Sequence, residues 1–264
     1  MGMTATLNEC FTNMMVNTRD IIIDEKGQRD VEARKAQFNA IMRDFNPYKV
    51  NDLKVALVDG KYYCFDGQMT RKVLIARNGG KDLMVPCKVY KGLTLYDAAM
   101  LFCQQNENKS VVSPAQIIRV CFNYGDKDAI GFVRETEKNG MYISWSGGKS
   151  KYTITAVQTA FELFKSFEDA QDYGRMIRVI RQAWNGDEDA VKVKILKGLA
   201  MFLRVYRSDV NEERLIDKLS SVRPIDIIRD AEADRSSSVR KYAVKILEVY
   251  NKNARDASRL EYRM

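Results

Sequence analysis

One short stretch of the sequence gathers residues that could bind or transfer a phosphate group. After an apolar strand pattern and before a helical one come Asp66, Gly67, Gln68, Thr70, Arg71 and Lys72. Free N–H groups at the start of a helix attract phosphate or carboxylate. Glycine lets the backbone turn sharply, the amide and hydroxyl offer neutral hydrogen bonds, and the two cations offer charge. The alternative is a capped turn whose cations face solvent.

The complete absence of histidine limits the chemistry that this stretch could perform. It excludes Ser-His-Asp and Cys-His catalysis and histidine-ligated metals. The cysteines are widely spaced and form no CxxC pair; they are Cys10, Cys64, Cys87, Cys103 and Cys121. We therefore expect buried thiols, a reducing cytoplasmic location, no disulfide framework and no metal site.

The charge of the chain favours an anionic partner. Its formal net charge is +8, which is typical of proteins that bind nucleic acid or nucleotides, although a solvated basic surface is the alternative. No apolar run approaches the ~20 residues of a membrane span. The first twenty residues lack the basic and apolar regions of a secretory signal. We expect DNA or a nucleotide as partner, and no membrane.

The pattern of apolar residues predicts an α+β protein. Residues 1–19 show no period and are expected to be a flexible lead-in. A helix is predicted over 31–45, a hairpin over 53–65 with Asp59-Gly60 at its turn, and a helix over 68–77. The strand over 83–90 contains Pro86, which suggests an edge strand or a bulge. The α/β domain is expected to span residues 20–110.

Residues 111–264 are expected to form an all-helical domain with a small β segment near 140–154. Helices are predicted near 115–125, 154–167, 171–184, 188–206, 211–220, 224–233 and 237–252. The helix over 188–206 places Ile195, Leu199, Phe202 and Tyr206 on one face, at steps of 4, 3 and 4, so this face should pack in the core.

Basic residues on two of these helices could follow a nucleic-acid backbone. Arg175, Arg178 and Arg181 recur at steps of three, and Lys194 and Lys197 add charge on the next helix. The alternative is the solvated face of an amphipathic helix.

Farther along, three aspartates at steps of four could bind a cation together; they are Asp226, Asp230 and Asp234. Ion pairs with Arg223 and Arg229 are the alternative.

The Asp-Gly-Gln stretch and its surroundings resemble the DGQHR-type corner of ParB/sulfiredoxin-like domains. The order of features is similar over residues 20–110: an upstream Gln-Arg, a helix, an Asn-Pro, a hairpin, the corner, a strand and a further helix. In this sequence the Gln-Arg is Gln28-Arg29, and the last helix ends near Asn106. The remainder is similar to an uncharacterised family of bacterial and phage genomes.

Members of this superfamily use the corner differently. ParB-type proteins bind a cytidine nucleotide and DNA, sulfiredoxins use a cysteine and ATP, a related kinase transfers phosphate, and some relatives are proposed nucleases. The resemblance implies a nucleotide- or phosphate-binding set of Gln28, Arg29, Asp66, Gly67, Gln68, Thr70, Arg71, Lys72 and Asn106. Met69 replaces the histidine of the motif, and Cys64 precedes the Asp-Gly pair, so we favour binding over catalysis and disfavour sulfiredoxin activity.

Three functions follow from these observations. The first is a nucleic-acid-associated, ParB-like binding protein of a phage or mobile element, with a nucleoside triphosphate and Mg²⁺ as the candidate cofactor. The second is a metal-dependent nuclease, nucleotide hydrolase or phosphotransferase, with Asp66 as metal ligand or base. The third is a protein-interaction module, such as a phage counter-defence factor.

Overall fold

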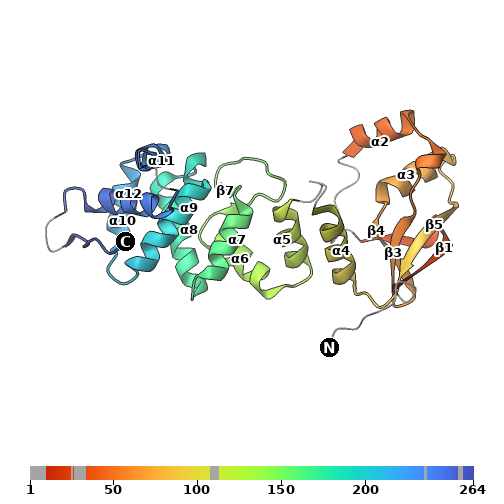
Figure 1. Cartoon of the computed structure of the whole chain (residues 1–264), viewed down its shortest axis with the longest axis horizontal. Coiled ribbons are helices and arrows are strands. Elements are labelled where there is room, and N and C mark those ends of the chain that lie inside the picture. The colour runs from red at the N-terminus through yellow and green to blue at the C-terminus, as the bar shows by residue number, and fades with distance from the viewer. Residues whose placement is uncertain (1–9, 25, 27–33, 108–112, 235–236, 255–257) are drawn as a thin grey trace. The chain divides into compact units, whose positions relative to one another are not determined.

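The chain folds into two compact units, residues 1–113 and 114–264. The structure is a computed structural model that describes residues 10–24, 26, 34–107, 113–234, 237–254 and 258–264 (Figure 1). The first unit combines a mixed sheet with helices, and the second is almost entirely helical. The α+β class predicted from the sequence is confirmed, and the division follows Ser113, close to the boundary expected after residue 110.

The sheet of the first unit contains five strands within the described residues, in the order β1-β5-β3-β4-β2. Their bounds are β1 Phe11–Asn17, β2 Ile21–Ile23, β3 Leu53–Val58, β4 Lys61–Asp66 and β5 Met84–Tyr90. β1 pairs antiparallel with β5 and β3 with β4, whereas β2 runs parallel to β4 and β3 to β5.

Two expectations about strands are wrong. Residues 11–17 belong to the sheet and are not a flexible lead-in; the apolar alternation is missing because residues 12–15 of β1 are exposed. β5 is an interior strand, not an edge. Pro86 is tolerated there because pairing with β3 begins only at Cys87, while β1 covers the other side.

The predicted hairpin and the helix after it are confirmed. Asp59 and Gly60 have φ angles of 49° and 74°, as the left-handed turn of a tight hairpin requires. Helix α3, Gln68–Arg77, has the predicted bounds. Helix α2, Lys35–Arg43, is shorter than the prediction of 31–45, of which residues 31–33 lie outside the described part.

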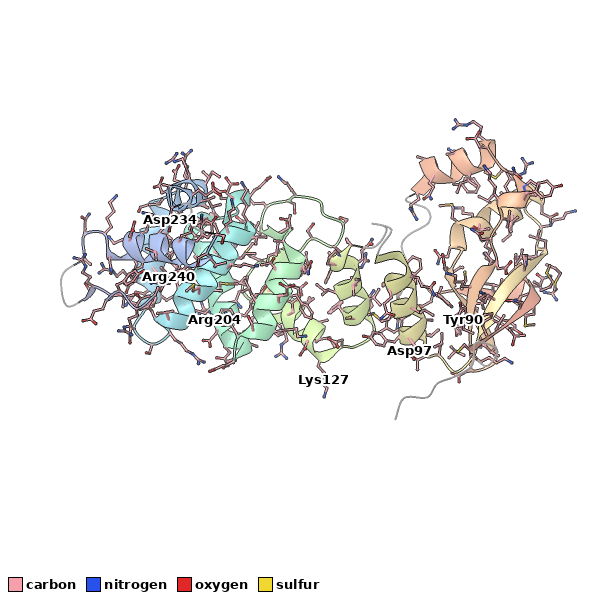
Figure 2. The ribbon with its side chains drawn as sticks, viewed as in Figure 1. Tyr90, Asp97, Lys127, Arg204, Asp234 and Arg240 are labelled. Carbon is pink, nitrogen blue, oxygen red and sulfur yellow. The ribbon has the colours of Figure 1, made fainter. Side chains whose placement is uncertain are left out.

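The sheet buries a different apolar set on each face. One set includes Val55, Cys64 and Cys87, with Leu74 of α3 packed against it. The other joins Ala56 and Phe65 to Ala98 of helix α4, Leu95–Glu107. Tyr90, labelled in Figure 2, packs against this second set. The centre of its ring lies 5.3 Å from the centre of the Phe65 ring.

A capping box formed by Thr94 and Asp97 starts α4. The Thr94 N–H donates to the Asp97 carboxylate at 2.9 Å, and the Asp97 N–H donates to the Thr94 hydroxyl oxygen at 3.1 Å. These bonds satisfy donors that the first turn of the helix would otherwise leave open.

The second unit packs its helices around one continuous core. The helices are α5 Pro114–Asn123, α6 Lys127–Lys138, α7 Val157–Ser166, α8 Ala170–Trp184, α9 Val193–Val205, α10 Glu212–Ser220, α11 Pro224–Glu232 and α12 Arg240–Asn251. The predicted β segment forms two short parallel strands, β6 Tyr142–Ile143 and β7 Thr153–Ile154. No helix in the described part of the chain is long and apolar enough to span a bilayer.

The predicted core face of α9 is confirmed, since Ile195, Leu199, Phe202 and Tyr206 are fully buried. The helix predicted over 188–206 is interrupted at Lys192, whose extended backbone separates a short 3₁₀ turn, Glu188–Val191, from α9. Helix α6 was not predicted, although Asp126 caps it by accepting a hydrogen bond from the Ala129 N–H.

Candidate phosphate-binding site

Gly67 makes the turn between β4 and α3, and the structure shows why glycine stands there. Its φ is 101°, in the left-handed region. A Cβ added to Gly67 would lie 2.6 Å from Leu53 Cδ2 and 3.3 Å from Leu53 Cα, so a side chain would collide with β3. The sharp turn expected at the corner is therefore present and is specific to glycine.

The first turn of α3 presents backbone donors that bond to no other described residue. The Arg71 N–H is the first to bond within the helix, to the Gly67 carbonyl at 2.9 Å. The N–H groups of Gln68, Met69 and Thr70 precede it, and Gly67 supplies no side-chain cap. Gln68 and Thr70 are half-buried, and neither side chain is hydrogen-bonded to another described residue. The backbone donors and the polar residues Gln68 and Thr70 therefore lie within the same first turn of α3.

A bulge in β4 brings Lys54 to the corner. The sequence did not predict this cation there. Counting outward from the Asp59-Gly60 turn pairs Lys54 with Phe65, but the register shifts and Lys54 pairs with Asp66. The Lys54 ammonium lies 3.0 Å from the Asp66 carboxylate and donates to Gln105 Oε1 of α4 at 2.5 Å. The side chains of Lys54 and Asp66 are 30% and 36% exposed, so solvent reaches both.

Arg71 is hydrogen-bonded to the scaffold behind the corner. Its Nε and Nη2 donate to the carbonyl oxygen of Thr18 at 3.2 and 2.6 Å. Thr18 is fully buried, and its hydroxyl donates to Asp82 at 2.7 Å. The guanidinium thus joins α3 to the turn between β1 and β2. The structure gives Arg71 a structural role, and its predicted phosphate contact stays a prediction.

The structure describes only some of the remaining residues of the predicted binding set. The Lys72 ammonium lies 5.5 Å from the centre of the Phe38 ring on α2. Gln28 and Arg29 lie outside the described residues, and Asn106 is in α4 with its side chain outside them. The structure therefore brings together Asp66, Gly67, Gln68 and Thr70 of the predicted set, and adds Lys54.

The cysteine nearest the corner is not an activated nucleophile. Cys64 is buried, and burial together with the nearby charges of Asp66 and Cys87 raises its pKa to about 12. Burial, with the charge of Asp52, also raises the pKa of Cys87 to about 11. Because the thiolate is the reactive form, these thiols are unreactive at neutral pH. The expectation of a packing role for Cys64 is met.

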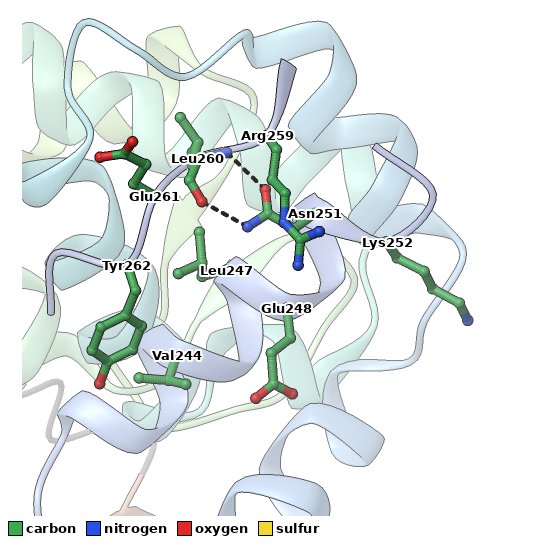
Figure 3. Close-up of a pocket in the computed structure, with 9 residues that line it drawn as sticks. All are labelled: Val244, Leu247, Glu248, Asn251, Lys252, Arg259, Leu260, Glu261 and Tyr262. Atoms are coloured by element: carbon green, nitrogen blue, oxygen red, sulfur yellow. Dashed lines mark hydrogen bonds between the residues drawn. The ribbon is translucent and has the colours of Figure 1, made fainter. Parts of the chain in front are cut away.

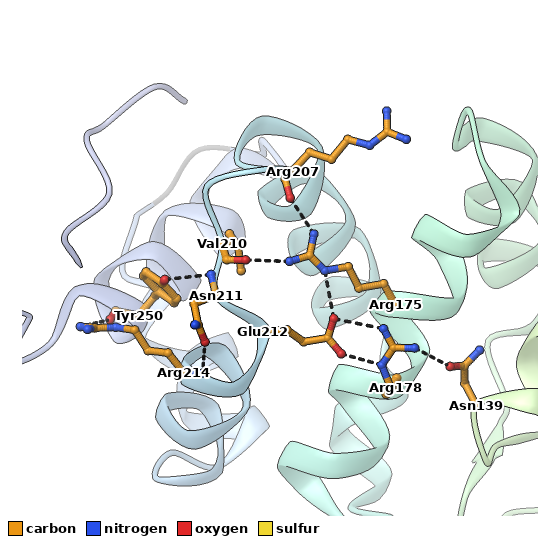
Figure 4. A network of polar contacts seen from close by, with 9 residues as sticks. All are labelled: Asn139, Arg175, Arg178, Arg207, Val210, Asn211, Glu212, Arg214 and Tyr250. Atoms are coloured by element: carbon orange, nitrogen blue, oxygen red, sulfur yellow. Dashed lines mark hydrogen bonds and ion pairs between the residues drawn. The ribbon is translucent and has the colours of Figure 1, made fainter. Parts of the chain in front are cut away.

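In the helical unit, two of the predicted nucleic-acid contacts are engaged inside the fold (Figure 4). Arg178 donates to both carboxylate oxygens of Glu212, at 2.5 and 3.1 Å. Arg175 donates to Glu212 at 3.2 Å and to the carbonyls of Arg207 and Val210 at 2.7 and 2.9 Å. These bonds join α8 to the start of α10, so the structure assigns both arginines a packing role.

The other basic residues of the predicted stripe also have neighbours. The Arg181 guanidinium lies 3.7 Å from the centre of the Tyr152 ring and donates to Asn185. Lys194 is paired with Glu232, and Lys197 is half-buried on α9. Arg181 and Lys194 are therefore engaged within the helical unit, and nucleic-acid binding by the basic residues stays a prediction.

The predicted ion pairs of the aspartate series are present. Asp226 lies 2.9 Å from Arg223 and 3.0 Å from Arg229. Arg229 also pairs with Asp230 at 3.4 Å. The described residues contain no group of three or more Cys, Asp or Glu that could hold a metal ion.

Comparison with known proteins adds one finding. A family model described as "Family of unknown function (DUF6551)" matches residues 23–261, which is nearly the whole chain and includes the corner and both units. No curated protein matches the sequence.

Proposed function

The chain belongs to the DUF6551 family, whose function is unknown, and we propose that it binds the phosphate of a nucleotide or nucleic acid at the start of α3. One observation carries this proposal. The N–H groups of Gln68, Met69 and Thr70 lie ahead of the first helical hydrogen bond, and within the described part of the chain no side chain caps them. Such a helix start is electrostatically suited to an anion.

The neighbouring side chains extend this donor set. Gln68 and Thr70 can each add a hydrogen bond to a phosphate oxygen, and Lys54 can supply the positive charge that Arg71 does not. The Asp-Gly-Gln resemblance to ParB/sulfiredoxin-like domains and the net charge of +8 favour a nucleotide or DNA over a carboxylate ligand.

Asp66 would act as a partner of Lys54 or as a ligand for Mg²⁺ arriving with a nucleotide. A divalent cation at Asp66 would release the Lys54 ammonium toward the phosphate, so nucleotide and Mg²⁺ should bind together. The lack of histidine and the ion pair at Asp66 favour binding over catalysis. Under the enzyme alternative, Asp66→Asn abolishes a Mg²⁺-dependent hydrolysis that the wild type performs.

A thermal-shift panel tests the proposal. Nucleoside triphosphates with and without Mg²⁺ should raise the melting temperature of the wild type, because a ligand that binds the folded state stabilises it. Thr70→Val and Gln68→Ala should each reduce the shift, whereas Thr12→Val, at an exposed position on β1, should leave it unchanged.

DNA is tested separately, by titration over a range of salt concentrations. Absence of any nucleotide shift together with absence of DNA binding at low salt would overturn the proposal.

A further inference from the structure

Residues 258–264 form an extended segment, here called the strap, which lies against α12 in the helical unit (Figure 3). Leu260 is its single buried side chain, at 8% exposure. Arg259, Glu261, Tyr262 and Arg263 are exposed. Leu260 belongs to the core of the helical unit, and half-buried Met264 also packs against that core. Two apolar contacts separated by exposed residues are a pattern that a bound extended peptide also shows.

Four hydrogen bonds join the helical unit to the backbone of the strap. Side chains of the strap add contacts, among them Ser258 with Arg214 and Tyr262 with Arg240. Asn251, the last residue of α12, accepts a hydrogen bond from the Leu260 N–H and donates one to the Leu260 carbonyl, both at 2.9 Å. The Tyr206 hydroxyl donates to the Glu261 carbonyl at 2.7 Å and accepts from the Arg263 N–H at 3.1 Å. These four bonds are independent of the side chains on the strap.

The polar atoms that hold the strap would be costly to leave unpaired. Tyr206 is fully buried, and Asn251 uses both ends of its amide on Leu260. A buried hydroxyl and a carboxamide need new partners when the old ones leave. An extended peptide offers the required N–H and carbonyl groups at matching positions, so the surface selects another peptide over a small ligand.

The surface around the strap determines which side chains a bound peptide could place there. An open hollow of about 650 Å³ lies beside Leu260, with Val244 and Leu247 on its α12 side. Three residues beyond Leu260, the Arg263 guanidinium lies 2.6 Å from Asp209. The surface therefore accepts an aliphatic side chain followed, three positions later, by a basic one.

We propose that this groove is a peptide-recognition site that the strap occupies in cis. Its occupant in trans is an extended segment of a partner protein, with leucine as anchor and arginine or lysine three residues later. The partner displaces the strap and takes over the bonds to Asn251 and Tyr206.

Fluorescence anisotropy with a labelled peptide of residues 258–264 tests this proposal. The wild-type chain should bind it weakly, because the strap competes. The Leu260→Asp chain should bind it at least tenfold more tightly, because its own strap has lost its anchor. Asn251→Ala in the Leu260→Asp background should remove the binding, as should a peptide with Asp in place of the leucine. Equal binding by the wild type and Leu260→Asp, or binding that survives Asn251→Ala, would overturn the proposal.

Hydrogen exchange of the wild type gives a readout that does not depend on a variant. The Leu260 N–H should exchange through a local opening that is insensitive to low denaturant concentrations. If it exchanges only with global unfolding, or if Leu260→Asp unfolds the helical unit, the strap is an integral part of the core and the proposal fails.

Discussion

The guanidinium of Arg71 donates two hydrogen bonds to the backbone carbonyl of Thr18, at 3.2 and 2.6 Å. These residues are 53 positions apart, and their contact fastens the first turns of α3 to the segment between β1 and β2. An arginine whose sequence position suggested a phosphate ligand therefore orders the scaffold that presents the N–H groups of the proposed phosphate site.

Replacing Arg71 should lower stability before it affects binding. Arg71→Ala should reduce the free energy of unfolding by about 2 kcal/mol, since hydrogen bonds from charged donors are worth about 1.5 to 3 kcal/mol. Urea unfolding measures this change. Arg43→Ala, at an exposed position whose ion pair with Asp44 is solvated, should change it by less than about 0.5 kcal/mol. Equal effects of the two substitutions would contradict the structural role of Arg71.

Two glycines with positive φ provide a matched test of the turn. Gly60→Ala should cost about 1 to 2 kcal/mol through left-handed strain alone, because nothing lies within 4 Å of the added Cβ. Gly67→Ala meets Leu53 as well, which should add about 1 to 3 kcal/mol of overpacking. Denaturant unfolding of both variants gives the difference. A Gly67→Ala chain as stable as Gly60→Ala would mean that Leu53 yields without cost.

The local sequence pattern predicted the strands and the helix around the corner. It did not predict that Lys54 would pair with Asp66 there. The Asp59-Gly60 turn and the bounds of α3 follow from residue types within a few positions. The pairing of Lys54 with Asp66 depends on a bulge, which shifts the register by one residue and has no local signature here. β1 was missed for a related reason, because its exposed side chains remove the alternation that marks a strand.

In the helical unit, periodicity located the apolar faces but not the ion-pair partners of the polar ones. Ile195 and Phe202 are buried as the spacing predicted. Arg175 and Arg178 have the spacing of a solvent-facing stripe. Both, however, form ion pairs with Glu212, which lies 34 residues beyond Arg178. Sequence spacing shows which residues share a helix face; it cannot show which distant carboxylate will face them.

The Glu212 cluster predicts a dependence of stability on pH. Hydrogen bonding from Arg178, aided by the charges of both arginines, lowers the pKa of Glu212 below its ordinary value of 4.5. The stabilisation should therefore be complete above about pH 4.5 and lost as pH falls through the depressed folded-state pKa. Glu212→Gln should cost about 1 to 2 kcal/mol at pH 7.

Unfolding curves of the wild type and Glu212→Gln between pH 3 and 7 measure this dependence. The difference in unfolding free energy between them should shrink toward the acid end. Glu213→Gln, at the exposed neighbouring position, serves as the control. A difference that stays constant with pH would show that the carboxylate charge contributes nothing.

The cysteines should react at different rates. Cys64 and Cys87 are buried with pKa values raised to about 12 and 11, whereas Cys10 and Cys121 are half-buried. Iodoacetamide at pH 8 should therefore modify Cys10 and Cys121 at least tenfold faster, as peptide mass spectrometry would show. Preferential modification of Cys64 in the folded chain would instead indicate an activated thiol beside the corner.

Amide chemical shifts measured by two-dimensional NMR test the proposed phosphate site most directly. Titration with a nucleoside triphosphate and Mg²⁺, and separately with inorganic phosphate, should move the N–H signals of Gln68, Met69 and Thr70 more than any others. The movement should saturate, and Thr70→Val should weaken it. A bound nucleotide that leaves these three signals in place while shifting others would contradict the account.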